Sequence, residues 1–348
     1  MKILVTGSLG YIGAVTVPVL RAAGHDVVGL DTDYYRGCDL GDSPPDPELR
    51  LDVRDVEPKH LKGIDGVVHY AALSNDPLGD LDRELTLQIN HQATVRLAKA
   101  AKTAGVSRFV FSSSCSMYGS AGDDELDETA PLRPLTAYAE SKVRAEEELA
   151  GLADSDFAPV FMRNATAYGV SPRLRADLVL NNLVAWAHTT GKVRILSDGT
   201  SWRPLVHVED IAAAALAALE APSELVRGEA FNVGANAENH QVRDLAELVR
   251  ETVGDCTVEY AGAGDRDPRS YRVSFDKLSR VLPAFRASWT ARKGAAELVE
   301  AYRETRLDLA KFESSAFTRL ARLRELLDSG ELADDLRWRA GRAAAAAR

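Results

Sequence analysis

The chain contains 348 residues, of which 45% are hydrophobic and 27% are charged, so it has the composition of a folded globular protein rather than a disordered one. Its length corresponds to one large domain or two smaller ones. The formal net charge of −10 argues against nucleic acid and anionic membranes as partners, because an acidic surface repels phosphate groups at long range.

The first half of the chain alternates short apolar strands with helices. Strands are predicted at residues 2–5, 26–30, 66–70, 108–112 and 158–162, and helices at 11–23, 87–104 and 138–149. This alternation is typical of an α/β fold with a doubly wound parallel sheet. The second half is less regular, with helices predicted at 178–191, 206–221 and 242–254, a strand at 231–234, and a charged helical pattern from residue 295 onward.

Three glycines lie between the first predicted strand and the first predicted helix, in the run Thr6-Gly7-Ser8-Leu9-Gly10-Tyr11-Ile12-Gly13. Gly7 permits the tight turn, Gly10 lets a pyrophosphate approach the backbone, and Gly13 lets the helix pack closely against the sheet. Asp31 ends the second strand, 18 residues after Gly13. A carboxylate there accepts hydrogen bonds from the hydroxyls of an adenosine ribose and repels a 2′-phosphate. This pattern predicts a site for NAD rather than NADP.

A tyrosine and a lysine lie four residues apart in the helix predicted at 138–149, so Tyr138 and Lys142 share one helix face. A nearby ammonium group favours the phenolate and is expected to lower the pKa of Tyr138. Ser114 lies 24 residues earlier, after the strand predicted at 108–112, where its hydroxyl can bond the same substrate group. Together these residues predict a general acid/base site for exchange between an alcohol and a carbonyl.

In this order, these motifs resemble an extended short-chain dehydrogenase/reductase of the nucleotide-sugar epimerase/dehydratase family. TGxxGxxG, the terminal Asp31, SSxxxxYG and YxxxK all occur in the order of the family, and the resemblance runs from Met1 to about Asp276. It implies a Rossmann-type doubly wound parallel sheet with a smaller C-terminal α/β lobe. The NAD-binding domain then spans residues 1–168, the chain returns to it around 205–235, and residues 169–348 mainly form the substrate-binding lobe with a helical tail.

The resemblance also implies a role for each matching residue. Ser114, Tyr138 and Lys142 fall at the catalytic positions. Further cofactor contacts are implied for Asp52, Val53, Ala71, Ala72, Leu73, Asn90, Tyr138 and Lys142, beside Gly7, Gly10, Tyr11, Ile12, Gly13 and Asp31. Substrate contacts are implied for Ser116, Thr166, Asn182, Leu183, Arg203 and Arg266, the arginines because their forked donors fit phosphate oxygens.

Two departures from the family pattern bear on the reaction. In 4,6-dehydratases of the family the catalytic residue is followed by an Asp-Glu pair, whereas Cys115 and Ser116 follow Ser114. Neither can act as a carboxylate does, which argues against dehydration. Thr166 stands where many epimerases of the family have asparagine, so the contacts to the sugar differ from theirs.

We therefore predict a nucleotide-diphospho-sugar epimerase that oxidises one sugar carbon to a ketone and re-reduces it on the other face, with C4 as the favoured position. A net oxidoreductase, either a dehydrogenase or a 4-ketoreductase, is the alternative on the same site, and a non-catalytic NAD-binding sensor ranks third. Family resemblance also implies a homodimer paired through the helices at 87–104 and 138–149.

The remaining patterns favour ordinary structural roles. The cysteines, Cys38, Cys115 and Cys256, are too widely spaced for a disulfide framework or a CxxC zinc motif, and no histidine motif predicts a metal. The longest apolar run, 211–219, falls short of the ~20 residues of a membrane span, and a signal peptide is not recognisable, so a cytoplasmic location is expected. The run 146–148 is expected to be a solvated helix face, and 319–324 part of an amphipathic helix.

Overall fold

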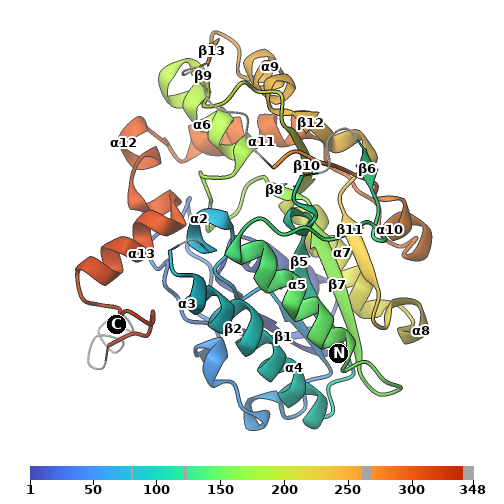
Figure 1. Ribbon diagram of the computed structural model, residues 1–348. Helices are drawn as coiled ribbons and strands as arrows, with labels where there is room; N and C mark the ends of the chain where they lie inside the picture. Colours follow the sequence, from blue (N-terminus) through green and yellow to red (C-terminus); the bar gives the residue numbers. More distant parts are fainter. Residues whose placement is uncertain (80, 121–123, 261–268, 340–348) are drawn as a thin grey trace.

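The computed structural model describes residues 1–79, 81–120, 124–260 and 269–339 (Figure 1). Its centre is a sheet of seven parallel strands in the order β11-β7-β5-β4-β1-β2-β3. The strands are β1 (Lys2–Thr6), β2 (Asp26–Asp31), β3 (Leu49–Arg50), β4 (Gly66–His69), β5 (Arg108–Ser114), β7 (Ala158–Asn164) and β11 (Ala230–Val233). The predicted doubly wound parallel sheet is confirmed.

Each face of this sheet is covered by its own set of helices, because successive side chains of a strand point to opposite sides. In β1, Ile3 and Val5 pack into a cluster with α1 (Gly13–Ala22) and α7 (Val208–Glu220), while Leu4 packs into a second cluster with α4 (Ala93–Thr103) and α5 (Ala137–Ala150). Both faces are therefore apolar, which is why the strands read as continuous hydrophobic runs.

A smaller lobe lies beyond the carboxyl ends of the central strands, at the top of Figure 1. Its separate core joins three helices, α6 (Val179–Thr190), α9 (Val242–Val253) and α11 (Ala291–Glu304). Its strands are β8 (Thr166–Tyr168), β9 (Lys192–Ile195), β10 (Trp202–His207), β12 (Asn239–Gln241) and β13 (Thr257–Tyr260), and two-residue strands β6 (Glu125–Leu126) and β14 (Arg272–Val273) pair nearby. Four shorter helices lie in various parts of the molecule: α2 (Asp76–Gly79), α3 (Arg83–Leu87), α8 (Ser223–Val226) and α10 (Asp276–Val281).

The chain crosses between the two halves more than once. Strand β11 lies within residues 205–235, for which a return is predicted, and it takes an edge position in the central sheet. Helix α12 (Leu309–Phe312) still packs in the lobe, whereas α13 (Arg319–Asp328) and the turns that follow to residue 339 lead back. Leu323, Leu326 and Leu336 pack into the same cluster as α4 and α5. The assignment of residues 169–348 mainly to the lobe thus needs a correction for the last twenty described residues.

Several local expectations are also corrected. The helix expected at 206–221 begins at Val208, because the two preceding residues complete β10. The helix expected at 87–104 is split by a π-helical turn, η3 (Gln88–Gln92), between α3 and α4. Glu146 was expected to be solvated but is buried and forms an ion pair of 2.7 Å with Arg163, because this face of α5 packs against β7.

Within the described ranges, no helix is long and apolar enough to cross a membrane.

Candidate active site

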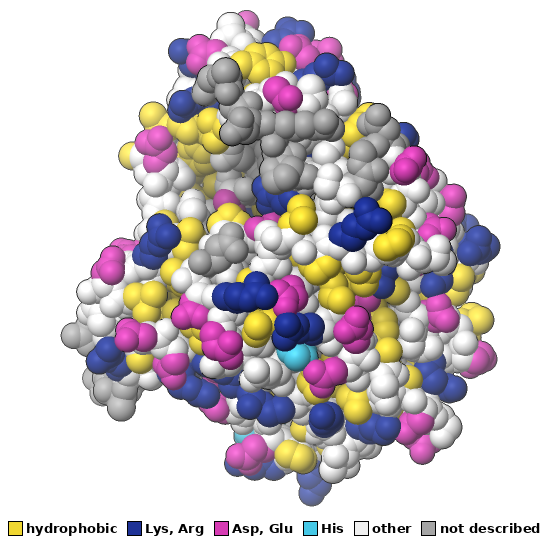
Figure 2. Space-filling view, viewed as in Figure 1, with side chains coloured by type: hydrophobic (Ala, Val, Ile, Leu, Met, Phe, Trp, Pro, Cys, Tyr) yellow, Lys and Arg dark blue, Asp and Glu magenta, His cyan; other side chains and the backbone are white. Residues whose placement is uncertain are grey.

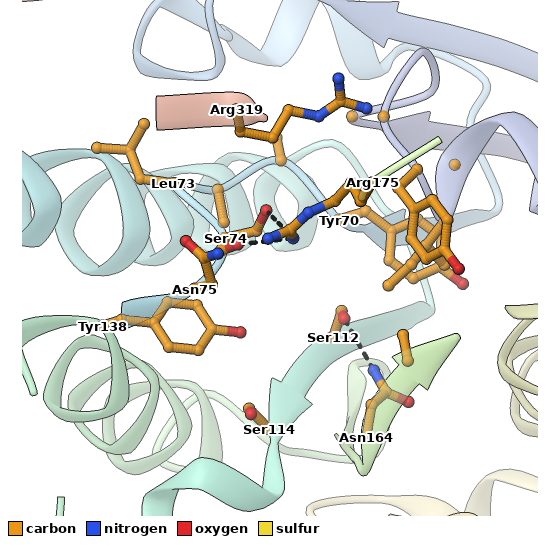
Figure 3. Close-up of a pocket in the computed structure, with 18 of the residues that line it drawn as sticks. Tyr70, Leu73, Ser74, Asn75, Ser112, Ser114, Tyr138, Asn164, Arg175 and Arg319 are labelled. Atoms are coloured by element: carbon orange, nitrogen blue, oxygen red, sulfur yellow. Dashed lines mark hydrogen bonds between the residues drawn. The ribbon is translucent and has the colours of Figure 1, made fainter. Parts of the chain in front are cut away.

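A cavity of about 420 Å³ opens at the carboxyl ends of the central strands, where α/β folds of this type bind ligands. Figure 3 shows side chains from both halves of the molecule pointing into it, with Tyr138 and Ser114 at one end and Arg175 and Arg319 above. Many of the residues predicted for cofactor and substrate line it: Gly7, Gly10, Tyr11, Ile12, Gly13, Asp31, Asp52, Val53, Ala71, Ala72, Leu73, Ser114, Ser116, Tyr138, Thr166 and Arg203.

The glycines of this run allow close approaches between backbone segments that a side chain would prevent. Gly7 adopts a φ of +70°, and its carbonyl accepts a hydrogen bond of 2.9 Å from the Gly10 amide. A Cβ atom on Gly13 would lie 2.0 Å from the Gly7 carbonyl oxygen, so α1 could not pack as closely against the loop. The loop thus places backbone amides and the start of α1 at the cavity wall, a suitable cradle for a pyrophosphate.

Asp31 lies at the end of β2 with its carboxylate held by the loop. Its oxygens accept hydrogen bonds from the amides of Leu9 (2.9 Å) and Asp33 (2.7 Å). Burial raises the pKa of Asp31, and these two amide bonds oppose the rise. The carboxylate faces the cavity from a fixed position, as a group that selects ribose hydroxyls requires.

Asp52 and Val53, for which cofactor contacts are predicted, line the cavity at the start of a short 3₁₀ turn. The Asp52 carboxylate caps this turn and forms an ion pair of 2.7 Å with Arg54. The residues predicted to contact the phosphates, the ribose and the adenine of NAD thus line the same cavity.

Asn90 does not line the cavity, although a cofactor contact was predicted for it. Its side chain is buried, accepts a hydrogen bond of 2.8 Å from the Leu73 amide and donates one of 3.0 Å to the Leu73 carbonyl. The π-helical turn that carries Asn90 directs it at this backbone. Asn90 thus fixes the segment of Ala71, Ala72 and Leu73, which does line the cavity.

Tyr138, Ser114 and Lys142 come together as the sequence predicts. Tyr138 and Ser114 both line the cavity, and the Lys142 ammonium lies 5.7 Å from the centre of the Tyr138 ring. Lys142 itself is buried behind the wall, where it donates a hydrogen bond of 2.7 Å to the Ser112 carbonyl and lies over the Phe111 ring.

The electrostatics of this group differ from the expectation. Burial raises the pKa of Tyr138 to about 12, and the hydrogen bond with Ser114 lowers it only in part. Burial also lowers the pKa of Lys142 to about 7. The predicted lowering of the Tyr138 pKa is therefore wrong, because burial raises this pKa by more than Ser114 and Arg175 lower it.

On the substrate side, Ser116, Thr166 and Arg203 line the cavity, whereas Asn182 and Leu183 do not. Asn182 donates a hydrogen bond of 2.9 Å to the Ala176 carbonyl, and Leu183 is buried in the core of the lobe. Helix α6 begins at Val179, so Leu178 and Val179 face the cavity and the two predicted residues lie one turn further along. The prediction for Asn182 and Leu183 is corrected accordingly. Arg266 lies outside the described residues.

Several cavity residues were not predicted from the sequence. Arg175 donates to the Ser74 carbonyl (2.8 Å) and forms an ion pair of 2.6 Å with Asp177, and all three line the cavity. Arg269 also lines it and pairs with Asp76, and Asn164 donates a hydrogen bond of 3.0 Å to the Ser112 hydroxyl. The sequence signal that could have indicated Arg175 is the pair of arginines shortly after Tyr168-Gly169.

Across the described ranges, no group of three or more histidine, cysteine or carboxylate side chains is arranged to hold a metal ion.

Comparison with known proteins agrees with this geometry. Residues 3–234 match the NAD dependent epimerase/dehydratase family. The chain is 30% identical over 304 residues to a UDP-glucose 4-epimerase of Corynebacterium glutamicum, and the alignment covers 81% of this chain and 90% of that protein. It is 25% identical over 322 residues to a dTDP-D-glucose 4,6-dehydratase of Mus musculus, covering 87% of this chain and 89% of that protein.

Solved structures show the same similarity. MoeE5 in complex with UDP-glucuronic acid and NAD aligns with a TM-score of 0.75 at 30% identity, over 88% of this chain and 100% of that one. DesIV, a dTDP-glucose 4,6-dehydratase from Streptomyces venezuelae solved with NAD, aligns with a TM-score of 0.75 at 25% identity, over 88% of this chain and 98% of that one. The chain is thus an NAD-dependent enzyme that belongs to the nucleotide-sugar epimerase/dehydratase family.

Proposed function

We propose that this enzyme is a nucleotide-diphospho-sugar epimerase that inverts one sugar carbon through a transient ketone, with C4 as the favoured position. The observation that carries the proposal is the placement of Tyr138 and Ser114 at one end of a cavity whose other end has the features of an NAD site. Relatives named as UDP-glucose 4-epimerases support the same reaction class.

The side chains present suit a proton transfer at a sugar hydroxyl. Bound NAD supplies a hydride acceptor and, later, a hydride donor. The Tyr138 phenol oxygen exchanges the hydroxyl proton, and the Ser114 hydroxyl orients the sugar oxygen by hydrogen bonding. Burial raises the pKa of Tyr138 to about 12, and the Ser114 hydrogen bond and the Arg175 charge oppose this rise. Positive charge near the phenol oxygen therefore favours the phenolate form.

Dehydration needs further acid/base groups beside the tyrosine, and the acidic groups nearest to it are engaged in other contacts. Cys115 is buried, with its thiol 3.0 Å from the Arg163 carbonyl, and it does not line the cavity. Asp76, whose charge raises the pKa of Tyr138, accepts a hydrogen bond of 2.6 Å from Thr136 and pairs with Arg269. Asp177 is paired with Arg175. Each of these acidic groups already has a structural partner.

The experiment is to incubate the purified enzyme with UDP-glucose and UDP-glucuronic acid, the nucleotide sugars named in related structures, and to follow epimer formation together with NADH absorbance. Epimer without net NADH supports the proposal. Stoichiometric NADH with no epimer would instead identify the alternative, a net oxidoreductase, which the threonine at position 166 leaves open.

A Tyr138→Phe variant tests the assigned base. We expect kcat to fall about 10²- to 10⁴-fold, the usual contribution of a positioned acid/base, with bound NAD unchanged. Tyr260→Phe is the control, because Tyr260 is exposed on the lobe. Turnover by Tyr138→Phe within tenfold of the parent would reject the assignment.

The homodimer through residues 87–104 and 138–149 and the cytoplasmic location remain predictions. Helices α4 and α5, which lie side by side on one face in Figure 1, are the surface proposed for pairing.

A further inference from the structure

The C-terminal segment, defined here as residues 309–339, brings a positive charge to the cofactor side of the cavity. Its first part packs in the core of the lobe through Phe312 and Phe317, and from Arg319 onward it packs against the Rossmann half (Figure 1). The Trp338 indole donates a hydrogen bond of 2.8 Å to the Thr32 carbonyl, and the Tyr34 hydroxyl donates one of 2.6 Å to the Leu336 carbonyl. Thr32 directly follows Asp31, so the segment is attached to the rim of the predicted ribose site.

Arg319, the first residue of α13, points from this segment into the cavity (Figure 3). Its side chain is 2% exposed, and its guanidinium lies 4.1 Å from the centre of the Tyr35 ring. One terminal nitrogen, Nη2, donates a hydrogen bond of 2.6 Å to the Arg173 carbonyl. The other, Nη1, is buried and has no hydrogen-bond partner among the described residues.

This cation also lacks a counterion in the described part of the chain. The adjacent Arg175 is paired with Asp177, whose carboxylate is already engaged by that arginine through two hydrogen bonds. Burial lowers the pKa of Arg319 to about 10, so the guanidinium remains protonated near neutral pH. A buried charge without a partner is costly, and an anionic ligand in the cavity would relieve that cost.

The position of Arg319 points to the cofactor rather than to the sugar nucleotide. Arg319 is bonded to the Arg173 carbonyl, and the loop that carries Arg173 is joined to the glycine run. In this junction the Ser171 hydroxyl donates to the Tyr11 carbonyl (2.8 Å), and the Tyr11 hydroxyl donates to the Gly169 carbonyl (2.7 Å). Arg203, the arginine assigned to the substrate, lies on β10 of the lobe instead.

We propose that Arg319 is a cofactor-binding residue whose guanidinium binds the pyrophosphate of NAD, opposite the amides of the glycine run. The C-terminal segment then holds the dinucleotide from the side that the Rossmann half leaves open. A planar fork of donors fits phosphate oxygens, and the unpaired Nη1 supplies the free donor. This inference concerns the cofactor alone and does not depend on whether the net reaction is epimerisation.

The test compares ligands that differ in phosphate content. Full-length protein freed of nucleotide is titrated calorimetrically with NAD, ADP, adenosine and UDP, for the parent and for Arg319→Gln. We expect affinity for NAD and ADP to fall about 10- to 100-fold, the effect of removing a hydrogen bond to a charged group, with adenosine unchanged within about twofold. Arg324→Gln is the matched control, because Arg324 is exposed on the same helix.

The outcomes separate a binding role from a structural one. Equal losses for adenosine and ADP would overturn the proposal, since they would mean that Arg319 only holds the fold. A loss for UDP with NAD unaffected would assign the guanidinium to the diphosphate of the sugar nucleotide and would equally overturn it. If Arg319→Gln does not fold, Arg319→Lys replaces it, because lysine keeps the positive charge. We expect the affinity of Arg319→Lys for NAD and ADP to fall about 3- to 10-fold, with the affinity for adenosine unchanged. Unchanged affinity for NAD and ADP in this folded variant would contradict a role for the forked guanidinium donors.

Discussion

Replacement of Gly13 by alanine gives the most direct test of how the glycine run works. The new Cβ atom would meet the Gly7 carbonyl oxygen at 2.0 Å, the Gly7 carbonyl carbon at 2.8 Å and the Ser8 Cα atom at 2.9 Å. All three are backbone atoms, so no side chain can rotate to relieve the contact, and either α1 or the loop must shift. Overpacking of this kind costs about 1–3 kcal/mol.

That cost can be converted into a melting temperature. At about 2.1 cal/mol/K per residue, the entropy of unfolding of a chain of this length is about 0.7 kcal/mol/K, so Tm should fall by about 1–4 °C. The shift of the loop should also weaken NAD binding by about tenfold or more, because at least one amide would leave its place at the pyrophosphate.

The assay is thermal unfolding of parent and variant, with and without NAD, together with titration of the cofactor. Gly151→Ala is the control, since a Cβ there would lie 3.5 Å from the Glu148 carbonyl oxygen, an ordinary contact. A Gly13→Ala variant that binds NAD as tightly as the parent would refute the reasoning, because it would show that the close approach of loop and helix is not needed.

Two further predictions concern charged groups at the site. Asp31→Asn should bind NAD about tenfold more weakly and discriminate less against NADP, since the variant loses the charge that repels a 2′-phosphate. Parallel titrations with NAD and NADP measure both affinities. An unchanged ratio of the two affinities would contradict the role given to Asp31. Lys142→Met addresses pH. Because burial lowers the Lys142 pKa to about 7 from its ordinary 10.5, the unfolded chain binds more protons between these values, and the stability of the parent rises with pH there. Urea unfolding at pH 6.5, 8 and 9.5 should therefore show the parent gaining stability relative to Lys142→Met as pH rises, whereas a constant difference would mean that Lys142 does not titrate in this range.

The parts of the site that could be predicted from the sequence are those whose geometry depends on near neighbours in the chain. Gly7, Gly10 and Gly13 form their loop because a strand precedes them and a helix follows. Tyr138 and Lys142 share a face because four residues make about one helical turn. Asp31 and Ser114 reach the cavity because parallel strands end at one edge of the sheet.

The tertiary structure decided whatever depends on packing between distant segments. Arg319 enters the cavity only because the C-terminal segment folds back onto the Rossmann half, about 300 residues after the glycine run, and its local sequence indicates no more than an amphipathic helix. Asn90 acts on the Leu73 backbone because of a π-helical turn. The pKa values of Tyr138 and Lys142 follow from burial, which the spacing of the two residues does not reveal, since desolvation depends on everything packed around them.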